Sequence, residues 1–351
     1  MIHLAWTMAN VARLLRDRDI VCLADDDQQA DALAGALRAA LPDHPILFIP
    51  SSDALPGDVA PASPANIGSR VAALHALRLA QQTRDRKHLA CVLSGEAAAR
   101  LYPPPDAFDS APPRLEIGDP VDVGEFAALI EEVGYFADDR VDEPGEMAVR
   151  GDVIDIFPAD AGQPARIEIV EGKIASIRSF DPVTQLSVTD LERLEIGRAA
   201  EPATDKPTAI LSHLRPGAIL LTEKADKRRR RFLQLAADAA SGRDGRLDAL
   251  ADADWNLALS AWERIEFDAA FEPTPRFAQT RSPLAALARF AKPLLGTRQF
   301  VLAGCERDLR FLKGRVAKRL GIDLVPVEDW NALDSIPPGG AAVITLPVDS
   351  G

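Results

Sequence analysis

The first part of the chain alternates short apolar runs with helical patterns. Residues 19–24 form an apolar run followed by three aspartates, and residues 28–41 then repeat Ala and Leu at helical spacing. Further apolar runs at 44–49 and 89–94 enclose a helical pattern at 67–82. Strands that alternate with helices in this way are typical of a parallel sheet covered by helices. We therefore predict an α/β layer in this part of the chain.

The pattern changes after a proline-rich stretch at residues 102–113, which we interpret as a domain boundary because proline removes a backbone donor and restricts the residue before it. A helical pattern at 123–134 comes next. Short β-type runs then follow one another at residues 151–157, 165–170 and 173–180. These runs predict a small β-rich module between residues 114 and 197.

The run at 165–170 places charged and aliphatic residues in strict alternation. Because successive side chains of a strand point to opposite faces, one face is expected to be buried. Arg166 and Glu168 then project together from the other face. We predict that they form a surface that another molecule can recognise.

The remainder of the chain returns to an α/β pattern. A strand at 218–222 with helices around it predicts that residues 198–282 complete the sheet of residues 1–113. Residues 283–351 contain a helical pattern at 306–320 between apolar runs and predict a separate small α/β domain. Four segments result, with boundaries at 1–113, 114–197, 198–282 and 283–351.

Composition supports several folded domains. The chain has 351 residues, of which 47% are hydrophobic and 26% charged, and this length exceeds what one hydrophobic core usually supports. The net charge of −13 is unevenly spread, because residues 109–200 contain 21 acidic and 8 basic residues and account for all of it. Such an acidic segment repels a phosphate backbone. We therefore expect it to meet a protein.

The sequence also restricts location and redox chemistry. No apolar run approaches the roughly 20 residues needed to cross a bilayer, and residues 1–10 lack the order of a secretory signal, so we expect a cytoplasmic protein without membrane contact. Cys22, Cys91 and Cys305 lie far apart in apolar surroundings. Their spacing fits neither a zinc site nor a redox pair, and we expect three core thiols.

Signatures of catalysis are missing from the sequence. It has no phosphate-binding Walker loop: its one Gly-Lys pair, Gly172 and Lys173, is followed by Ile174. The three aspartates after the first strand would repel a triphosphate. The closely spaced Asp152 and Asp155 suggest acid and base chemistry only weakly in so acidic a protein. We expect no cofactor, no metal and no catalytic residue in this chain.

One basic cluster stands out, the run Arg228, Arg229, Arg230 and Arg231. Arginines can neutralise phosphates, but no aromatic residues are interleaved to stack on bases. The run is therefore a candidate contact for nucleic acid or for an acidic partner. It also supports an alternative function, that of a DNA-binding or ATP-dependent helicase fragment.

Residues 145–158, 166–168 and 177–187 resemble the domain shared by the excision nuclease subunit UvrB and the bacterial transcription-repair coupling factors (Mfd). Residues 55–58, 63–64 and 69–74 are similar to the first segment of the coupling factors, and residues 342–351 to the end of their third domain. UvrB carries a Walker loop and an aromatic hairpin for DNA, which this sequence lacks. The resemblance is thus to the N-terminal region of the coupling factors. It implies a degenerate UvrB-like α/β fold of the P-loop type without a Walker loop, with the β-rich module inserted.

This resemblance implies that the module binds the repair protein UvrA. Arg150, Arg166 and Glu168 match the family's contact surface by position, and Val170 stands where coupling factors carry an aromatic residue. Arginine forks can pair with carboxylates of a partner, although internal salt bridges would use them equally well. RNA polymerase and DNA would be engaged only through regions absent from this chain, which include the ATP-driven motor. A diverged stand-alone adaptor with another protein partner remains a further alternative.

Overall fold

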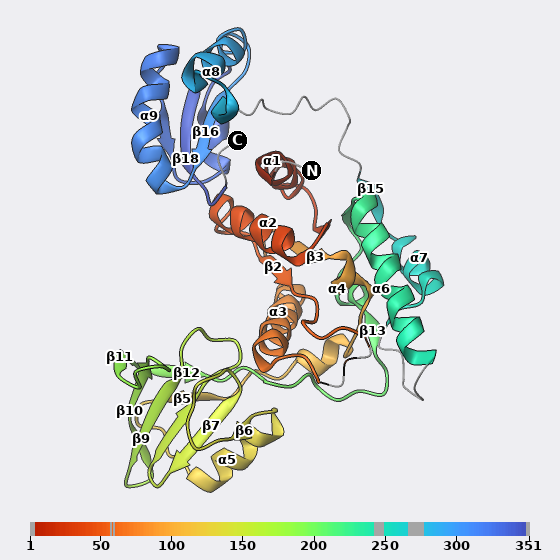
Figure 1. Cartoon of the computed structure of the whole chain (residues 1–351), viewed down its shortest axis with the longest axis vertical. Coiled ribbons are helices and arrows are strands. Elements are labelled where there is room, and N and C mark those ends of the chain that lie inside the picture. The colour runs from red at the N-terminus through yellow and green to blue at the C-terminus, as the bar shows by residue number, and fades with distance from the viewer. Residues whose placement is uncertain (1–3, 57, 59, 242–248, 266–276, 349–351) are drawn as a thin grey trace.

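The computed structural model describes residues 4–56, 58, 60–241, 249–265 and 277–348. Within these residues the strands form five sheets, of five, six, three, two and two strands, so the prediction of an α/β protein with several sheets is confirmed. In Figure 1 the β-rich module and the last α/β unit lie at opposite ends, and the five-stranded sheet lies between them.

The five-stranded sheet is parallel throughout, in the order β15-β14-β1-β3-β2. Its strands are β1 (Ile20–Ala24), β2 (Ile46–Ile49), β3 (Ala90–Ser94), β14 (Ala218–Leu221) and β15 (Glu263–Ile265). β1 and β3 are central, and their uninterrupted apolar runs are buried on both faces. β14 pairs with β1 and β15 pairs with β14, so both strands belong to the same sheet as β1, β2 and β3.

Helices cover both faces of this sheet. They are α1 (Leu4–Leu14), α2 (Asp27–Ala40), α3 (Pro64–Gln82), α4 (Gly95–Ala99), α6 (Glu223–Ser241) and α7 (Asp252–Leu259). α1 and α2 pack in one core, whereas α3, α4, α6 and α7 pack in the other. α2 begins where the Asp26 carboxylate accepts a hydrogen bond from the Gln29 amide. The sequence prediction missed α1.

The β-rich module contains a six-stranded sheet in the order β11-β10-β9-β8-β7-β6. Its strands are β6 (Phe136–Ala137), β7 (Glu146–Arg150), β8 (Val153–Ile156), β9 (Ala165–Val170), β10 (Lys173–Phe180) and β11 (Ser187–Leu191). The helix α5 (Val123–Glu132) and the strand pair β5 (Arg114–Glu116) and β12 (Arg193–Glu195) contribute to the core on one side of this sheet. Glu171 and Gly172 both have positive φ and form the tight turn between β9 and β10.

The last unit has three parallel strands in the order β16-β18-β17 and two helices. They are β16 (Phe300–Gly304), β17 (Val325–Val327), β18 (Ala341–Thr345), α8 (Pro283–Ala291) and α9 (Glu306–Leu320). Ile344, Leu346 and Val348 enter the core formed by α1 and α2, so this unit packs on the central sheet's helices. The Trp330 amide also donates to the Ala40 carbonyl at 2.8 Å.

Smaller elements complete the description. The strands β4 (Leu101–Tyr102) and β13 (Thr208–Ala209) form a pair, and 3-10 helices occupy Pro105–Phe108, Ile210–His213, Phe277–Gln279 and Asn331–Ser335. None of the helices formed by the described residues is both long and apolar enough to cross a membrane.

The three cysteines differ in their surroundings. Cys22 and Cys91 are buried free thiols, and burial raises the pKa of both, that of Cys91 to about 12. Cys305 is only half-buried, at the residue before α9. The prediction of three core thiols is therefore wrong for Cys305, because it lies at a strand end rather than inside the sheet.

Candidate protein-binding face of the β-rich module

The six-stranded sheet has a face that points away from α5, which we call the outer face. On β9 the side chains of Ala165, Ile167 and Ile169 are buried in the core, whereas Arg166, Glu168 and Val170 lie on the outer face. The strict alternation predicted from the sequence is confirmed. The outer face is defined by residues from four neighbouring strands: Arg150, Asp155, Arg166, Glu168, Val170 and Arg178.

A buried carboxylate lies at the centre of the outer face. Asp155 on β8 is 1% exposed and stands beside Arg166 on β9 in the strand register. Arg166 donates from Nε and Nη2 to the two Asp155 oxygens at 2.7 and 2.8 Å. Arg150 at the end of β7 donates from Nη1 to the same carboxylate at 3.2 Å. Two guanidinium groups thus offset one buried negative charge.

The Arg166 guanidinium is held from a second direction as well. It lies over the Phe180 ring at 5.0 Å from the centroid. The hydrogen bonds that the Arg166 guanidinium donates to the Asp155 carboxylate raise the pKa of Arg166 above its ordinary value. From the sequence, an internal salt bridge was an alternative to partner contact, and the structure shows this salt bridge for Arg166. The Arg166 side chain is half-buried.

Glu168 lies in a more open part of the outer face. It accepts a hydrogen bond from Ser176 Oγ at 2.8 Å and approaches Arg178 Nη2 at 3.3 Å. Both partners of this ion pair keep more than a third of their side chains exposed, and Val170, two residues after Glu168 on β9, is 59% exposed. An ion pair in this position contributes little to stability. Its groups remain accessible to a partner.

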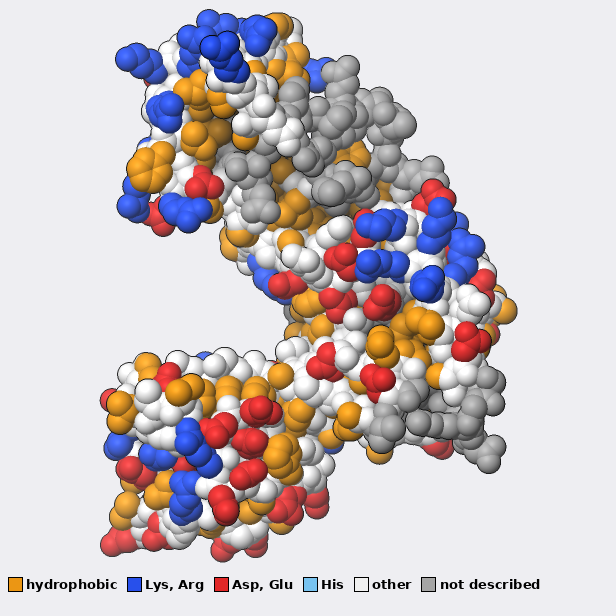
Figure 2. All heavy atoms as spheres, viewed as in Figure 1, with side chains coloured by type: hydrophobic (Ala, Val, Ile, Leu, Met, Phe, Trp, Pro, Cys, Tyr) orange, Lys and Arg blue, Asp and Glu red, His pale blue; other side chains and the backbone are white. Residues whose placement is uncertain are grey.

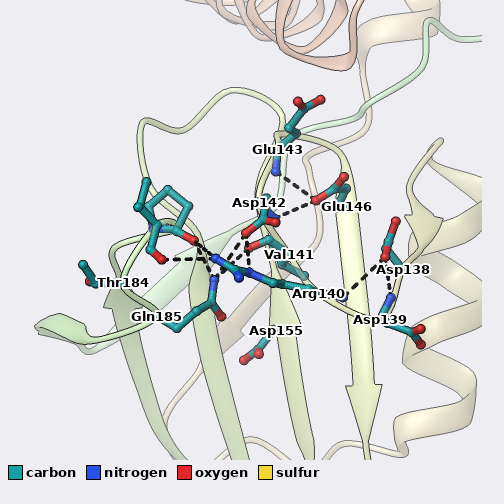
Figure 3. Close-up of polar contacts among 12 residues, drawn as sticks. Asp138, Asp139, Arg140, Val141, Asp142, Glu143, Glu146, Asp155, Thr184 and Gln185 are labelled. Atoms are coloured by element: carbon teal, nitrogen blue, oxygen red, sulfur yellow. Dashed lines mark hydrogen bonds and ion pairs between the residues drawn. The ribbon is translucent and has the colours of Figure 1, made fainter.

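Two loops close over one end of the outer face, and we call them the clasp: residues 138–145 and residues 181–186 (Figure 3). Arg140 donates to the carbonyl oxygens of Pro182 and Val183 at 3.0 and 3.1 Å. Gln185 donates from Nε2 to the Val141 carbonyl at 3.3 Å. These contacts join the two loops by side chains.

The clasp covers a small apolar cluster formed by Val141, Ala148, Phe157 and Phe180. The Glu146 carboxylate, itself buried, accepts hydrogen bonds from the backbone amides of residues 142 and 143 at 2.7 and 2.8 Å. The segments 145–158 and 177–187, which carry the family resemblance, contain Glu146 and three residues of this apolar cluster. Part of that resemblance thus reflects folding rather than partner contact.

The turn at 181–186 exposes apolar side chains that the sequence prediction missed. The Asp181 carboxylate accepts hydrogen bonds from the Thr184 and Val183 amides, which lower the pKa of Asp181. The turn leaves Val183 80% and Leu186 68% exposed. Turns usually consist of polar residues, glycine and proline, so two aliphatic residues in this turn were a sequence signal for an exposed apolar surface.

The arginine run on α6 does not form a single basic surface. Arg229 is 2% exposed, lies 2.6 Å from Asp252 and 2.9 Å from Asp226, and stacks on Trp255 at 5.1 Å. Arg230 also pairs with Asp226, at 2.6 Å, and Arg228 approaches Asp26 at 3.7 Å. The prediction of a four-arginine contact is wrong for Arg229, because successive residues of a helix point in different directions.

The three aspartates after β1 each have a neighbour at the carboxyl end of the sheet. Asp25 pairs with Lys224 at 2.8 Å, and Asp26 caps α2. Asp27 accepts hydrogen bonds from the Ser51 amide and hydroxyl at 2.7 and 2.8 Å. Within the described ranges no group of three or more His, Cys, Asp or Glu residues is placed to hold a metal ion.

Comparisons with known proteins support the module's identity. Residues 114–201 match the family model of the UvrB interaction domain. The chain is 30% identical over 187 residues to the transcription-repair-coupling factor of Bacillus subtilis (strain 168). This alignment covers 53% of this chain and 15% of the relative. The factor of Myxococcus xanthus is 32% identical over 188 residues, covering 52% and 15%.

The factor of Staphylococcus aureus (strain MSSA476) is 28% identical over 200 residues, covering 57% of this chain and 16% of the relative. These alignments span only 15 to 16% of the length of the curated relatives. The predicted resemblance to the N-terminal region of the coupling factors is confirmed. The outer face and the clasp lie within the segment that matches the UvrB interaction domain.

Proposed function

Because this chain combines a UvrB interaction domain with similarity to transcription-repair-coupling factors, we propose that residues 114–201 bind UvrA through the outer face. The chain then acts as a non-catalytic docking module that recruits UvrA to nucleotide excision repair. In this proposal it works in the cytoplasm and needs no cofactor. The outer face itself is proposed to contact neither RNA polymerase nor DNA.

The observation that carries this proposal is the pairing of oriented charges with accessible apolar groups. Val170 is 59% exposed and lies two residues after Glu168 on β9, opposite Lys173 of β10. Val188 on β11, the next strand of the sheet, is 55% exposed. Interfaces draw most of their affinity from a few apolar anchors surrounded by polar contacts. The outer face supplies both within one sheet.

The charged residues divide into two roles. Arg166 donates hydrogen bonds from Nε and Nη2 to Asp155 and therefore holds this buried carboxylate in place. Arg150 is about half exposed, and Glu168 keeps 38% of its side chain in solvent. We infer that Arg150, Glu168 and Val170 contact UvrA, while Arg166 supports them.

The test is a calorimetric titration of the chain with cognate UvrA. We expect Arg150→Glu and Glu168→Arg to weaken binding by about tenfold each, a size typical of charge reversal at an interface. Arg166→Glu is expected to weaken it too. Because Arg150 and Arg166 both pair with buried Asp155, either reversal places a second acid beside it, and thermal unfolding of both variants must be measured in parallel. Arg193→Glu on β12 is the matched control, an exposed arginine away from the outer face.

Unchanged affinity in Arg150→Glu and Glu168→Arg would remove the proposed site. If UvrA binds none of the proteins, wild type included, a diverged adaptor with another protein partner becomes the better account. The DNA-binding or helicase alternative based on Arg228 to Arg231 is weakened by the burial of Arg229.

A further inference from the structure

The last α/β unit carries a basic surface in an otherwise acidic protein. Residues 283–320 contain nine basic and two acidic residues, a net charge of +7 within a chain of −13. All nine basic side chains are exposed, and Figure 2 shows many Lys and Arg side chains gathered over this unit at the end of the molecule. They are Arg289, Lys292, Arg298, Arg307, Arg310, Lys313, Arg315, Lys318 and Arg319.

The helix α9 has one apolar and one basic side. Leu309, Val316 and Leu320 are buried against the unit's strands and α8. At 100° per residue, Arg307 and Lys318 lie on the opposite side of the helix, with Arg310 and Arg315 flanking them. We call this side the basic face of α9.

The cations of the basic face are weakly paired. Arg307 and Arg310 keep 84% and 71% of their side chains exposed. Arg307 reaches the neighbouring Asp308 at 3.4 Å, and Arg310 reaches Glu306 one turn away at 3.5 Å. Exposed pairs of this length contribute little, so the guanidinium groups can exchange these partners for another anion.

An aromatic ring stands in the middle of the basic face. Phe311 is 67% exposed and lies on the same side as Arg307 and Lys318. Gly314 follows one turn later, and an added Cβ there would meet open space. Packing of the unit does not account for an exposed phenylalanine among cations. Proteins that bind unpaired nucleic-acid strands combine cations, which contact the phosphates, with aromatic rings, on which the bases stack. The basic face of α9 offers both kinds of group.

We propose that the basic face of α9 binds single-stranded DNA, with Arg307, Arg310, Arg315 and Lys318 contacting phosphates and Phe311 stacking on a base. A duplex would use the cations but not the ring, since its bases are already stacked on one another. RNA offers the same chemistry, and the choice of DNA rests on the proposed role in repair. The surface itself is independent of UvrA binding.

The experiment measures fluorescence anisotropy of labelled 20-nucleotide oligo(dT) with the whole chain at 50 mM NaCl. We expect binding that weakens about 20- to 50-fold between 50 and 200 mM salt, as three to four phosphate contacts predict for a single strand. The double variant Arg307→Glu with Lys318→Glu should weaken binding by at least about tenfold. Phe311→Ala should weaken it by about fivefold or more without changing the salt dependence.

The matched control reverses two charges on another exposed basic helix, Lys227→Glu with Arg231→Glu on α6, and should leave affinity unchanged. Thermal unfolding of each variant verifies that the unit stays folded. Equal losses in the α6 and α9 variants, or no binding at 50 mM NaCl, would overturn the proposal. Tighter binding to oligo(U) or to duplex DNA than to oligo(dT) would also overturn the proposal. So would a salt-sensitive anisotropy signal that comes from the basic face binding the acidic module of a second copy of the chain, and not from DNA binding. UvrA titrations of the α9 variants should match wild type, which separates this site from the outer face.

Discussion

Arg166 donates from Nε to Asp155 Oδ1 at 2.7 Å, across the register pair that joins β8 to β9. The carboxylate is almost fully buried, whereas the guanidinium keeps about a quarter of its side chain in solvent. Arg166 therefore stabilises the module whether or not a partner is present. Any loss of binding on its replacement includes a loss of structure.

Removing Arg166 should destabilise the module. Arg166→Ala leaves Asp155 buried with only Arg150 beside it, and we expect the free energy of unfolding to fall by about 2–3 kcal/mol, somewhat less than for a buried charge stripped of every partner. Urea unfolding measures this change. Arg178→Ala is the matched control, because its pairs with Glu168 and Asp190 are exposed and should contribute less than about 1 kcal/mol. Equal effects of the two substitutions would show that Asp155 needs no compensation from Arg166.

His213 should make stability depend on pH. Burial lowers its pKa from 6.5 to about 4 in the folded chain, between the rings of Tyr102 and Phe108. Above pH 6.5 the residue is neutral in both states and has no effect. As pH falls below 6.5 the unfolded chain takes up the proton first, so stability falls until about pH 4.

We expect this histidine to cost about 2 kcal/mol of unfolding free energy between pH 7 and pH 5. The measurement compares urea unfolding of wild type with that of His213→Leu at both pH values. All other titrating groups are shared, so the difference between the two proteins isolates His213. A pH dependence identical in both would contradict the assigned burial.

Arg229 and Arg231 should behave oppositely although they are two positions apart. Arg229→Ala removes a buried cation that faces Asp226, Asp252 and Trp255, and we expect a loss of about 2–4 kcal/mol. Arg231→Ala changes an exposed side chain and should stay within about 0.5 kcal/mol. Thermal unfolding of both variants provides the comparison. A larger effect at Arg231 would mean that α6 is rotated relative to the arrangement seen here.

The sequence predicted the elements whose pattern was locally complete. β9 and α9 have the bounds predicted from strict alternation and helical spacing, because the apolar side of each is unbroken. β10 also has the predicted bounds, although its register with β9 shifts between Ile174 and Ser176. α1 was not predicted. Its buried side chains pack in a core shared with α2 and the central sheet, and these contacts are remote from the local pattern.

Whether each arginine is exposed or paired depends on contacts with residues that are remote in the sequence. Alternation placed Arg166 on the outer face, but the neighbouring carboxylate comes from the register between β8 and β9, which no local pattern fixes. For Arg229 a local signal did exist. It shares helical spacing with Ala225, Phe232 and Ala236, which are all buried, so it continues the apolar side of α6.

Val170 tests the central proposal most directly, because it is exposed on the outer face and makes no ion pair that its replacement would break. The measurement is the calorimetric affinity of the whole chain for UvrA with Val170→Asp and Val170→Phe. Leu129→Asp, an exposed aliphatic on α5 at the other side of the module, is the matched control. We predict at least about tenfold weaker binding for Val170→Asp, tighter binding for Val170→Phe and no change for Leu129→Asp. Equal affinities for wild type and Val170→Asp would contradict UvrA docking on the outer face.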